Sequence, residues 1–283
     1  MNARIDPAVL QQRVRDLPAL PQAIAEALTA LRNEAVGADR CAELIGRDPV
    51  LAARVLRLAN SAFYGVPGRV NSIRDAVHLL GRRALGSLLT VAMTAGLFDA
   101  SRCKGFDYSG FWRHGLATAL AARALARTLQ ADEDGAFTCG LLHDIGRLAL
   151  AAQFPEALSA ALQRGRELDG GEALFEVEVL GVDHAAYGAA VARQWRLPAE
   201  VVQAIASHHA PMPAAGGGPS QADIVHCCDA IAHALDLAGD AEESVPHLDA
   251  GAWQRVALPA QSASEIFAQT ESALAELAKC MGL

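Results

Sequence analysis

Histidines and aspartates recur through the second half of the chain in an order that could build a metal site. The residues are His114, His143 with Asp144, His184, His208 with His209, and Asp229. Imidazole nitrogens and carboxylate oxygens together suit iron, manganese or zinc. A carboxylate has two oxygens, so Asp144 could also bridge a pair of metal ions. The set therefore predicts a divalent transition-metal site (Fe, Mn or Zn) that holds one or two ions.

A purely structural role is the alternative for each of these residues. A single histidine on an apolar helix face is more often a hydrogen-bonded core residue than a ligand, since buried polar groups find partners. The doublet His208-His209 could instead favour the negative end of a helix dipole. His226 is intermediate, because it precedes Asp229 by three residues and could support a ligand from the same helix face. We assign a structural role to the remaining histidines, His78, His233 and His247.

The spacing of apolar residues predicts that these side chains lie on helices. In the first half, predicted helices cover about 22–36, 49–60, 73–80 and 85–98. In the second half, they cover about 111–129, 135–152, 155–168, 184–195, 198–207, 221–237 and 264–280. We find no alternating strand pattern of useful length and no internal repeat. The sequence predicts an all-α, two-lobed helical bundle.

A looser segment at 99–107 suggests the first domain boundary. We expect an N-terminal helical subdomain over 1–107, a second subdomain carrying the metal site over 108–240, and a C-terminal helical extension over 241–283. The apolar face of that last helix is expected to cover the bundle, because such faces usually pack on their own domain.

Composition narrows the class of protein. Hydrophobic residues make up 52% of the 283 residues and aromatics 5%, so the core is expected to consist of aliphatic side chains on helices. The net charge of −8 opposes binding to phosphate backbones. Six cysteines without a CxxC pair indicate buried thiols in a reducing compartment. The N-terminus does not resemble a signal peptide, and the most apolar window, 88–98, is about half the roughly 20 residues of a membrane span. We therefore expect a soluble, cytoplasmic protein.

Several stretches, covering about two thirds of the chain, together resemble one known family. In the first half they are LPALP at 17–21, the segment 45–64 with Asp48-Pro49 and LRLANSAFY, and 70–81. In the second half they are FWRH at 111–114, GLLHDIG at 140–146, GVDH at 181–184, WRLP at 195–198 and the doublet at 208–209. The combination resembles the HDOD domain, a relative of the HD-domain metal-dependent phosphohydrolases of bacterial signalling proteins. The resemblance implies an N-terminal HDOD-type helical subdomain followed by an HD-like bundle.

Carried over residue by residue, the resemblance divides the candidate ligands into two sets. It implies that the core metal ligands are His114, His143, Asp144 and Asp229. It also implies that the additional ligands of relatives with two metals are His184, His208 and His209. In those enzymes the metals activate a bound water and polarise a phosphoryl oxygen. Asp144 and Arg147 are the candidates for a catalytic role.

The chain departs from the cyclic-di-GMP phosphodiesterase branch at two places. Arg147 stands where that branch has a lysine, and Ala-Pro-Met-Pro follows His208-His209 in place of a Gly-Tyr-Pro motif. An arginine binds phosphate but does not readily donate a proton, because it stays charged. Hydrolysis of cyclic-di-GMP is therefore not expected.

Two functions follow from the resemblance. The first is a regulatory signal-transduction protein that acts through protein partners and without catalysis. We favour it on the resemblance, and hydrolytic chemistry does not require the N-terminal block at 17–81. The alternative is a metal-dependent phosphohydrolase, a phosphodiesterase or nucleotidase, in which Arg113 and Arg147 could bind a phosphate. No membrane is expected as a partner. Direct DNA binding is a third, weaker option: Arg54, Arg57 and Arg82-Arg83 form small basic spots, but the net charge opposes it. The apolar helical surface is compatible with a homodimer.

Overall fold

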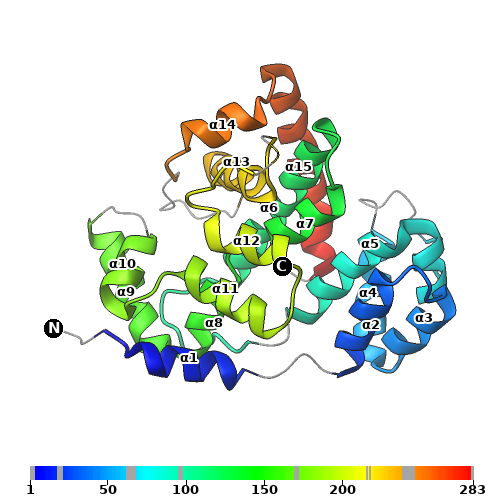
Figure 1. Ribbon diagram of the computed structural model, residues 1–283, viewed down its shortest axis with the longest axis horizontal. Helices are drawn as coiled ribbons and strands as arrows, with labels where there is room; N and C mark the ends of the chain where they lie inside the picture. The colour runs from blue at the N-terminus through cyan, green and yellow to red at the C-terminus, as the bar shows by residue number, and fades with distance from the viewer. Residues whose placement is uncertain are drawn as a thin grey trace. The chain divides into compact units, whose positions relative to one another are not determined.

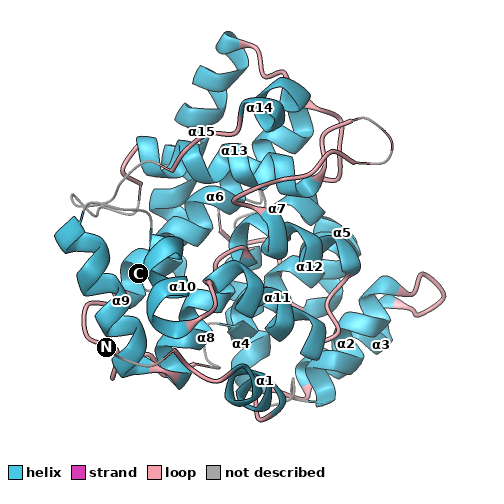
Figure 2. Ribbon diagram, turned by 60° about the vertical axis from the view of Figure 1, so that its left-hand side comes forward, coloured by secondary structure: helices cyan, strands magenta, loops and turns pink. Residues whose placement is uncertain are grey.

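The computed structural model describes residues 4–17, 22–61, 68–94, 98–168, 172–214, 216, 218–237 and 246–281. Within these ranges the chain forms helices and connecting loops and contains no strand (Figure 2). The predicted all-α class is confirmed. The chain packs into two compact units: the first comprises residues 1–17 and 98–270, and the second comprises residues 18–97 and 271–283.

The first unit contains most of the helices labelled in Figure 1. They are α1 (Pro7–Arg15), α6 (Tyr108–Thr128), α7 (Glu133–Leu142), α8 (Ile145–Gln153), α9 (Pro155–Leu168), α10 (Glu172–Leu180), α11 (His184–Gln194), α12 (Ala199–Ser207), α13 (Gln221–Ala234), α14 (Ala250–Val256) and the first half of α15 (Ala260–Met281). Helix α1 joins this unit because it packs on α11, and the Ile5 amide donates a hydrogen bond to the carbonyl of Leu180 (3.1 Å).

Small residues let the helices of the first unit approach closely. Helix α6 is rich in alanine and is buried over most of its length, packed between α7 and α13. A Cβ at Gly140 of α7 would lie 2.8 Å from the Cα of Ala119 on α6, so only glycine allows this crossing. Because α6, α7 and α13 pack closely, side chains from these three helices can meet in the interior of the first unit.

Aspartates begin several of these helices. Each accepts a hydrogen bond from a backbone amide of the first turn, which satisfies a donor that would otherwise have no partner in the helix. These N-cap residues are Asp6, Asp107, Asp132, Asp183 and Asp249. The helices α1, α3, α10 and α14, each of nine residues or fewer, were not predicted.

The second unit contains α2 (Gln22–Arg32), α3 (Ala38–Gly46), α4 (Pro49–Ala59), α5 (Ile73–Thr94) and the second half of α15. Asp48 accepts hydrogen bonds from the amides of Val50 and Leu51, so the predicted helix start at Asp48-Pro49 is confirmed. Helix α5 kinks at Gly81, whose φ of 84° lies in the left-handed region that glycine tolerates. The backbone of Gly81 is not helical, so two helical segments meet there, and the predicted break between two helices at this glycine is confirmed.

The two compact units do not follow the predicted division at 107/108 and 240/241. Residues 4–17 pack with the chain after residue 98, and α15 contributes to both units. The division into subdomains at 1–107, 108–240 and 241–283 stays a prediction. The predicted motif residues 18–21 and 62–67, and the start of the C-terminal extension at 241–245, lie outside the described residues.

Two predictions from composition can be compared with the described residues. Five of the six cysteines are buried free thiols, as expected, and the side chain of Cys280 lies outside the described set. No helix in the described part of the chain is long and apolar enough to cross a membrane.

Candidate metal centre

A first cluster joins His114 of α6, His143 after α7, and Asp229 of α13. His114 Nε2 lies 2.9 Å and His143 Nε2 lies 3.4 Å from Asp229 Oδ1, and the two Nε2 atoms are 3.3 Å apart. All three side chains are buried. Their ligand atoms are close enough to bind one metal ion together.

A second cluster consists of His184, the first residue of α11, with His208 and His209 at the end of α12. His184 Nε2 lies 2.7 Å from His209 Nε2 and 3.4 Å from His208 Nε2. His184 and His208 are buried, whereas His209 is exposed. These three residues could also share one ion.

Asp144 connects the two clusters. Its Oδ1 atom lies 3.2 Å from His184 Nε2, 3.5 Å from His208 Nε2 and 3.6 Å from His143 Nε2. One carboxylate oxygen therefore faces histidines of both clusters, which is the position of a bridging ligand. The structure brings all seven predicted ligand residues together in the first unit.

The tautomers of the histidines test whether these residues fit a metal. The Nδ1 atom of His143 lies 2.7 Å from the carbonyl oxygen of Gly140, and that of His208 lies 2.8 Å from the carbonyl oxygen of Ile205. A carbonyl oxygen has no hydrogen to donate, so Nδ1 must carry the proton and Nε2 of the neutral ring carries a lone pair. These lone pairs converge with carboxylate oxygens. Electron pairs in this arrangement repel one another unless a cation lies between them, so the donor set fits divalent metal ions.

The chain breaks where His143 and Asp144 enter the site. The predicted single helix over 135–152 is wrong, since α7 ends at Leu142 and α8 begins at Ile145. Asp144 adopts φ −98° and ψ 11°, in the sparsely populated region between the helical and extended conformations. Apolar periodicity continues across this break, which explains why the sequence pattern did not reveal it.

The charges of the site shift the pKa values of its carboxylates. Burial would raise the pKa of Asp144, but the charges of His143 and His184 hold it well below its usual value. The pKa of Asp229 is likewise well below its usual value despite burial, because His114 and His143 contact it. Without a bound metal, burial would lower the pKa of His184, yet the carboxylates of Glu176 and Asp144 raise it to about 10. A metal ion bound at Nε2 would displace the proton from that nitrogen. Both aspartates therefore stay ionised, as metal ligands must.

Two residues outside the predicted ligand set contact it. His233, to which we assigned a structural role, lies one helical turn after Asp229, and its Nε2 is 3.3 Å from Asp229 Oδ1. Glu176 of α10 was not considered, although its Oε2 atom lies 2.7 Å from His184 Nδ1. A carboxylate within the apolar run 173–180 was the sequence signal for Glu176.

The remaining candidates lie at different distances from the site. Arg147 contacts it, with Nη1 3.3 Å from Asp144 Oδ2. His226 supports the backbone, because its Nδ1 donates to the carbonyl of His208 (2.6 Å), while its Nε2 accepts from the amide of Asp249 (2.8 Å). Arg113 follows Trp112 on α6 and is partly buried. The exposed side chains of the other histidines agree with a role outside the site; these are His78 and His247.

Comparisons with known proteins agree with this fold. A crystal structure of a "Putative phosphohydrolase" from Shewanella amazonensis SB2B superposes with a TM-score of 0.76 at 32% identity, over 96% of this chain and 98% of that one. A crystal structure of an HDOD domain protein from Geobacter sulfurreducens superposes with the same TM-score at 24% identity, over 96% and 99% of the two chains. The second likeness shows the fold alone.

The sequence comparisons cover a shorter segment. A protein of Treponema pallidum (strain Nichols) is 30% identical over 204 residues, which make up 71% of this chain. The chain spans only about two fifths (39%) of the length of that relative. The HDOD domain family matches residues 17–211.

Fold and site together define an all-helical protein related to the HD phosphohydrolases, with a buried cluster of histidines and aspartates. The chain belongs to the HDOD family. The resemblance noted in the sequence is thereby confirmed.

Proposed function

We propose that this protein is a cytoplasmic regulatory protein of bacterial signal transduction that binds two divalent transition-metal ions and acts through protein partners. The observation that carries the proposal is the burial of the site: six of its seven residues are at most 5% exposed, and His209 is the exposed one. A metal held in this way couples several helices of the first unit, and its binding stabilises the folded arrangement over looser ones.

Each proposed metal position has its own ligands. The first would be held by His114, His143 and Asp229. The second would be held by His184, His208 and His209, and Asp144 would bridge the two. Iron, manganese and zinc all accept this mixture of imidazole and carboxylate donors.

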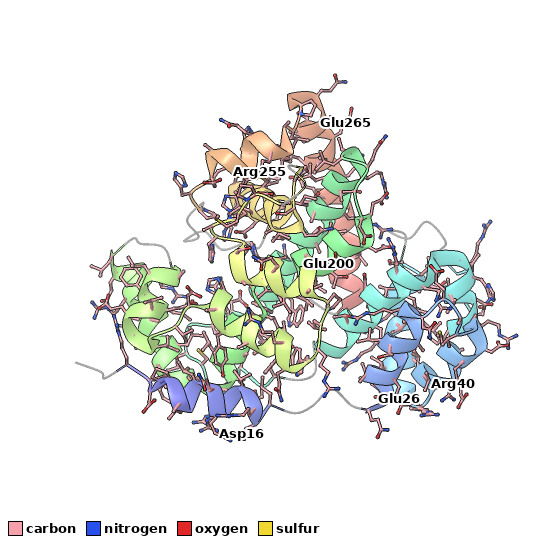
Figure 3. All side chains as sticks on the ribbon, in the orientation of Figure 1. Asp16, Glu26, Arg40, Glu200, Arg255 and Glu265 are labelled. Atoms are coloured by element: carbon pink, nitrogen blue, oxygen red, sulfur yellow. The ribbon has the colours of Figure 1, made fainter. Side chains whose placement is uncertain are left out.

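Elemental analysis of protein purified without added metal is the first test. We expect close to two transition-metal ions per chain in the wild type. The variant Asp144→Asn should lose metal, and Glu265→Gln, an exposed carboxylate on α15 (Figure 3), should retain it. A wild-type protein that contains no metal, and takes none up on dialysis against Fe²⁺, Mn²⁺ or Zn²⁺, would contradict the metal site.

The regulatory role needs a separate test in the native host. Replacing the chromosomal gene by the Asp144→Asn variant should reproduce the phenotype of a deletion, while Glu265→Gln should behave as wild type. Chemical cross-linking should link this protein to a partner protein in the wild-type strain and in the Glu265→Gln strain. The cross-linked partner should be absent from the Asp144→Asn strain. A deletion without any phenotype would count against regulation. The cross-linked mass would also reveal a homodimer.

A metal-dependent phosphohydrolase is the second candidate, and the position of Arg147 favours it. Its guanidinium contacts Asp144 and its side chain is 16% exposed, so it could bind a phosphate beside the site. Bound metal ions would supply Lewis-acid activation of a phosphoryl oxygen and of water. The Shewanella structure that superposes at 32% identity carries the name "Putative phosphohydrolase". Turnover of a phosphodiester or nucleotide by metal-loaded protein, lost in Arg147→Gln, would establish this function, and metal without turnover would leave the regulatory one.

A further inference from the structure

The carboxylate of Glu176 is fully buried and directed at one histidine of the site. Glu176 lies on α10 and is 0% exposed. Its Oε2 atom accepts two hydrogen bonds from His184, one from the backbone amide (2.7 Å) and one from the ring at Nδ1 (2.7 Å). In the described part of the chain its ion pair is with His184.

A simple role as helix cap does not account for this residue. The amide of His184 is the first of α11, but Asp183 already caps that helix by accepting from the amide of Ala186 (2.7 Å). A cap also needs only a neutral oxygen, which serine or asparagine supplies. A buried carboxylate is costly unless a positive charge lies near it. Its second oxygen, Oε1, is buried and has no hydrogen-bond partner among the described residues. Among those residues, His184 is therefore the group through which the negative charge of Glu176 can be balanced.

The ring of His184 connects Glu176 to the second metal position. With its proton fixed on Nδ1 by the carboxylate, His184 turns Nε2 toward Asp144 (3.2 Å), where it also meets His208 and His209. Carboxylate–histidine–metal arrangements of this kind orient the ring and raise the basicity of the ligating nitrogen. At the first position, Nδ1 of His143 donates its hydrogen bond to the carbonyl oxygen of Gly140. This acceptor is neutral, so it raises the basicity of the ligating nitrogen less than a carboxylate does.

We propose that Glu176 is a positioning residue that selectively strengthens the second metal position. It acts through His184 and supplies a third buried carboxylate, besides Asp144 and Asp229, to balance the charge of two divalent ions. This inference rests on the proposed metal site. It implies that the two positions differ in affinity because of a residue that touches neither ion.

Glu176→Gln is the sharpest variant, because the amide oxygen can still accept both hydrogen bonds while the charge is lost. Glu176→Ala removes the hydrogen bonds as well. The matched control is Glu178→Gln on the same helix, where the carboxylate forms an exposed ion pair with Arg164 (2.8 Å). Metal-free protein is titrated with Co²⁺, whose visible absorption reports on the coordination of each bound ion, and binding is measured in parallel by equilibrium dialysis.

We expect two binding steps in the wild type and in Glu178→Gln. Glu176→Gln should weaken one step by about 10-fold and Glu176→Ala by up to about 100-fold, while the other step stays unchanged. The thermal midpoint of metal-free Glu176→Gln should fall, because Glu176 also balances the charge of His184 there. Below that midpoint the variant should keep the circular-dichroism spectrum of the folded wild type, which separates positioning from folding. If both Glu176 variants bind two ions with wild-type affinity and spectrum, the inference is wrong and the metal site stands. If the wild type binds no Co²⁺, the proposed metal site itself fails.

Discussion

The carbonyl oxygen of His184 occupies the space where a Cβ of Gly146 would lie. Gly146 is on α8, two residues after Asp144, and it also lies against the backbone of Gly188 on α11. Two glycines thus allow α8 and α11 to cross with their backbones in contact. This crossing sets the distance between Asp144, the proposed bridging residue, and His184, a ligand of the second proposed position.

Gly146→Ala should therefore damage both folding and the site. The added methyl group must push α11 away, which we expect to cost about 2 kcal/mol in the free energy of unfolding, as overpacking does elsewhere. It should also weaken metal binding at the second position, since His184 moves with α11. Urea unfolding and Co²⁺ titration measure the two effects.

Gly86→Ala is the control for this substitution. Gly86 lies within α5, and apart from its chain neighbours and the nearby backbone of its own helix, a Cβ there would meet no described atom within 4 Å. Alanine at this position should stabilise the helix by roughly 0.5–1 kcal/mol. Equal stability of the Gly146 and Gly86 variants would show that α8 and α11 can separate without cost.

Asp144→Asn and Asp229→Asn should differ in how many ions they lose. Asp144 contacts histidines of both clusters, whereas Asp229 contacts His114 and His143 of the first cluster. We expect Asp144→Asn to weaken both binding steps and Asp229→Asn to weaken one. The measurement is metal stoichiometry after dialysis against a fixed concentration of Zn²⁺. The same loss in both variants would mean that Asp144 does not bridge.

The sequence was informative about the site because metal chemistry restricts the residue types. Few side chains other than histidine and aspartate offer such ligands, so seven residues could be chosen from their type, order and family motifs. Glu176 was missed, and the contact of His233 with Asp229 was not foreseen, because both depend on which neighbour each side chain faces in the fold. Only the packing of α10 on the site and the position of His233 one turn after Asp229 reveal those contacts.

The fold was predictable where apolar periodicity was long and uninterrupted. The long helix α6 and the helix start at Asp48-Pro49 were anticipated. The break between α7 and α8 was not, because His143 and Asp144 interrupt the backbone geometry and leave the apolar pattern intact. The association of α1 with the chain after residue 98 depends on contacts distant in sequence, such as that between Ile5 and Leu180.

Arg82 should be essential for the stability of the second unit. Its guanidinium donates to the carbonyls of Leu31 (3.0 Å) and Asn33 (2.8 Å) at the end of α2 and to Val36 (2.6 Å) before α3. A lysine cannot reproduce this planar set of donors. We expect Arg82→Lys to lower the free energy of unfolding by about 2 kcal/mol, measured by urea denaturation.

Arg40→Gln is a suitable comparison in the same unit. Arg40 forms an exposed ion pair with Glu43 (2.6 Å) and lies on the surface of α3, with Glu26 nearby on α2 (Figure 3). Exposed pairs contribute little, so this variant should be close to wild type. If Arg82→Lys proves as stable as Arg40→Gln, the carbonyls at the end of α2 must find other donors.

The ion pair between Asp223 and Arg255 should make stability depend on pH. Arg255 reaches from α14 (Figure 3) to Asp223 Oδ1 on α13, with Nε at 3.0 Å, and also donates to the carbonyl of Pro211 (3.0 Å). Burial would raise the pKa of Asp223, but Arg255 and Ser220 lower it below its usual value. A carboxyl group whose folded-state pKa is lowered stabilises the protein above its unfolded pKa of about 3.9, and this stabilisation is lost as the pH falls through the lower, folded value.

Arg255→Gln removes much of this pKa shift, so the thermal midpoint of the variant should be lower than that of the wild type at pH 6. The gap should narrow as the pH falls below about 4, because Asp223 becomes protonated in both proteins and the pair no longer distinguishes them. Metal-free protein in the presence of a chelator keeps the nearby histidines from contributing through a bound ion. A gap that stays constant from pH 6 to pH 3 would mean that Arg255 stabilises the fold through its hydrogen bond to Pro211 and not through the charge of Asp223.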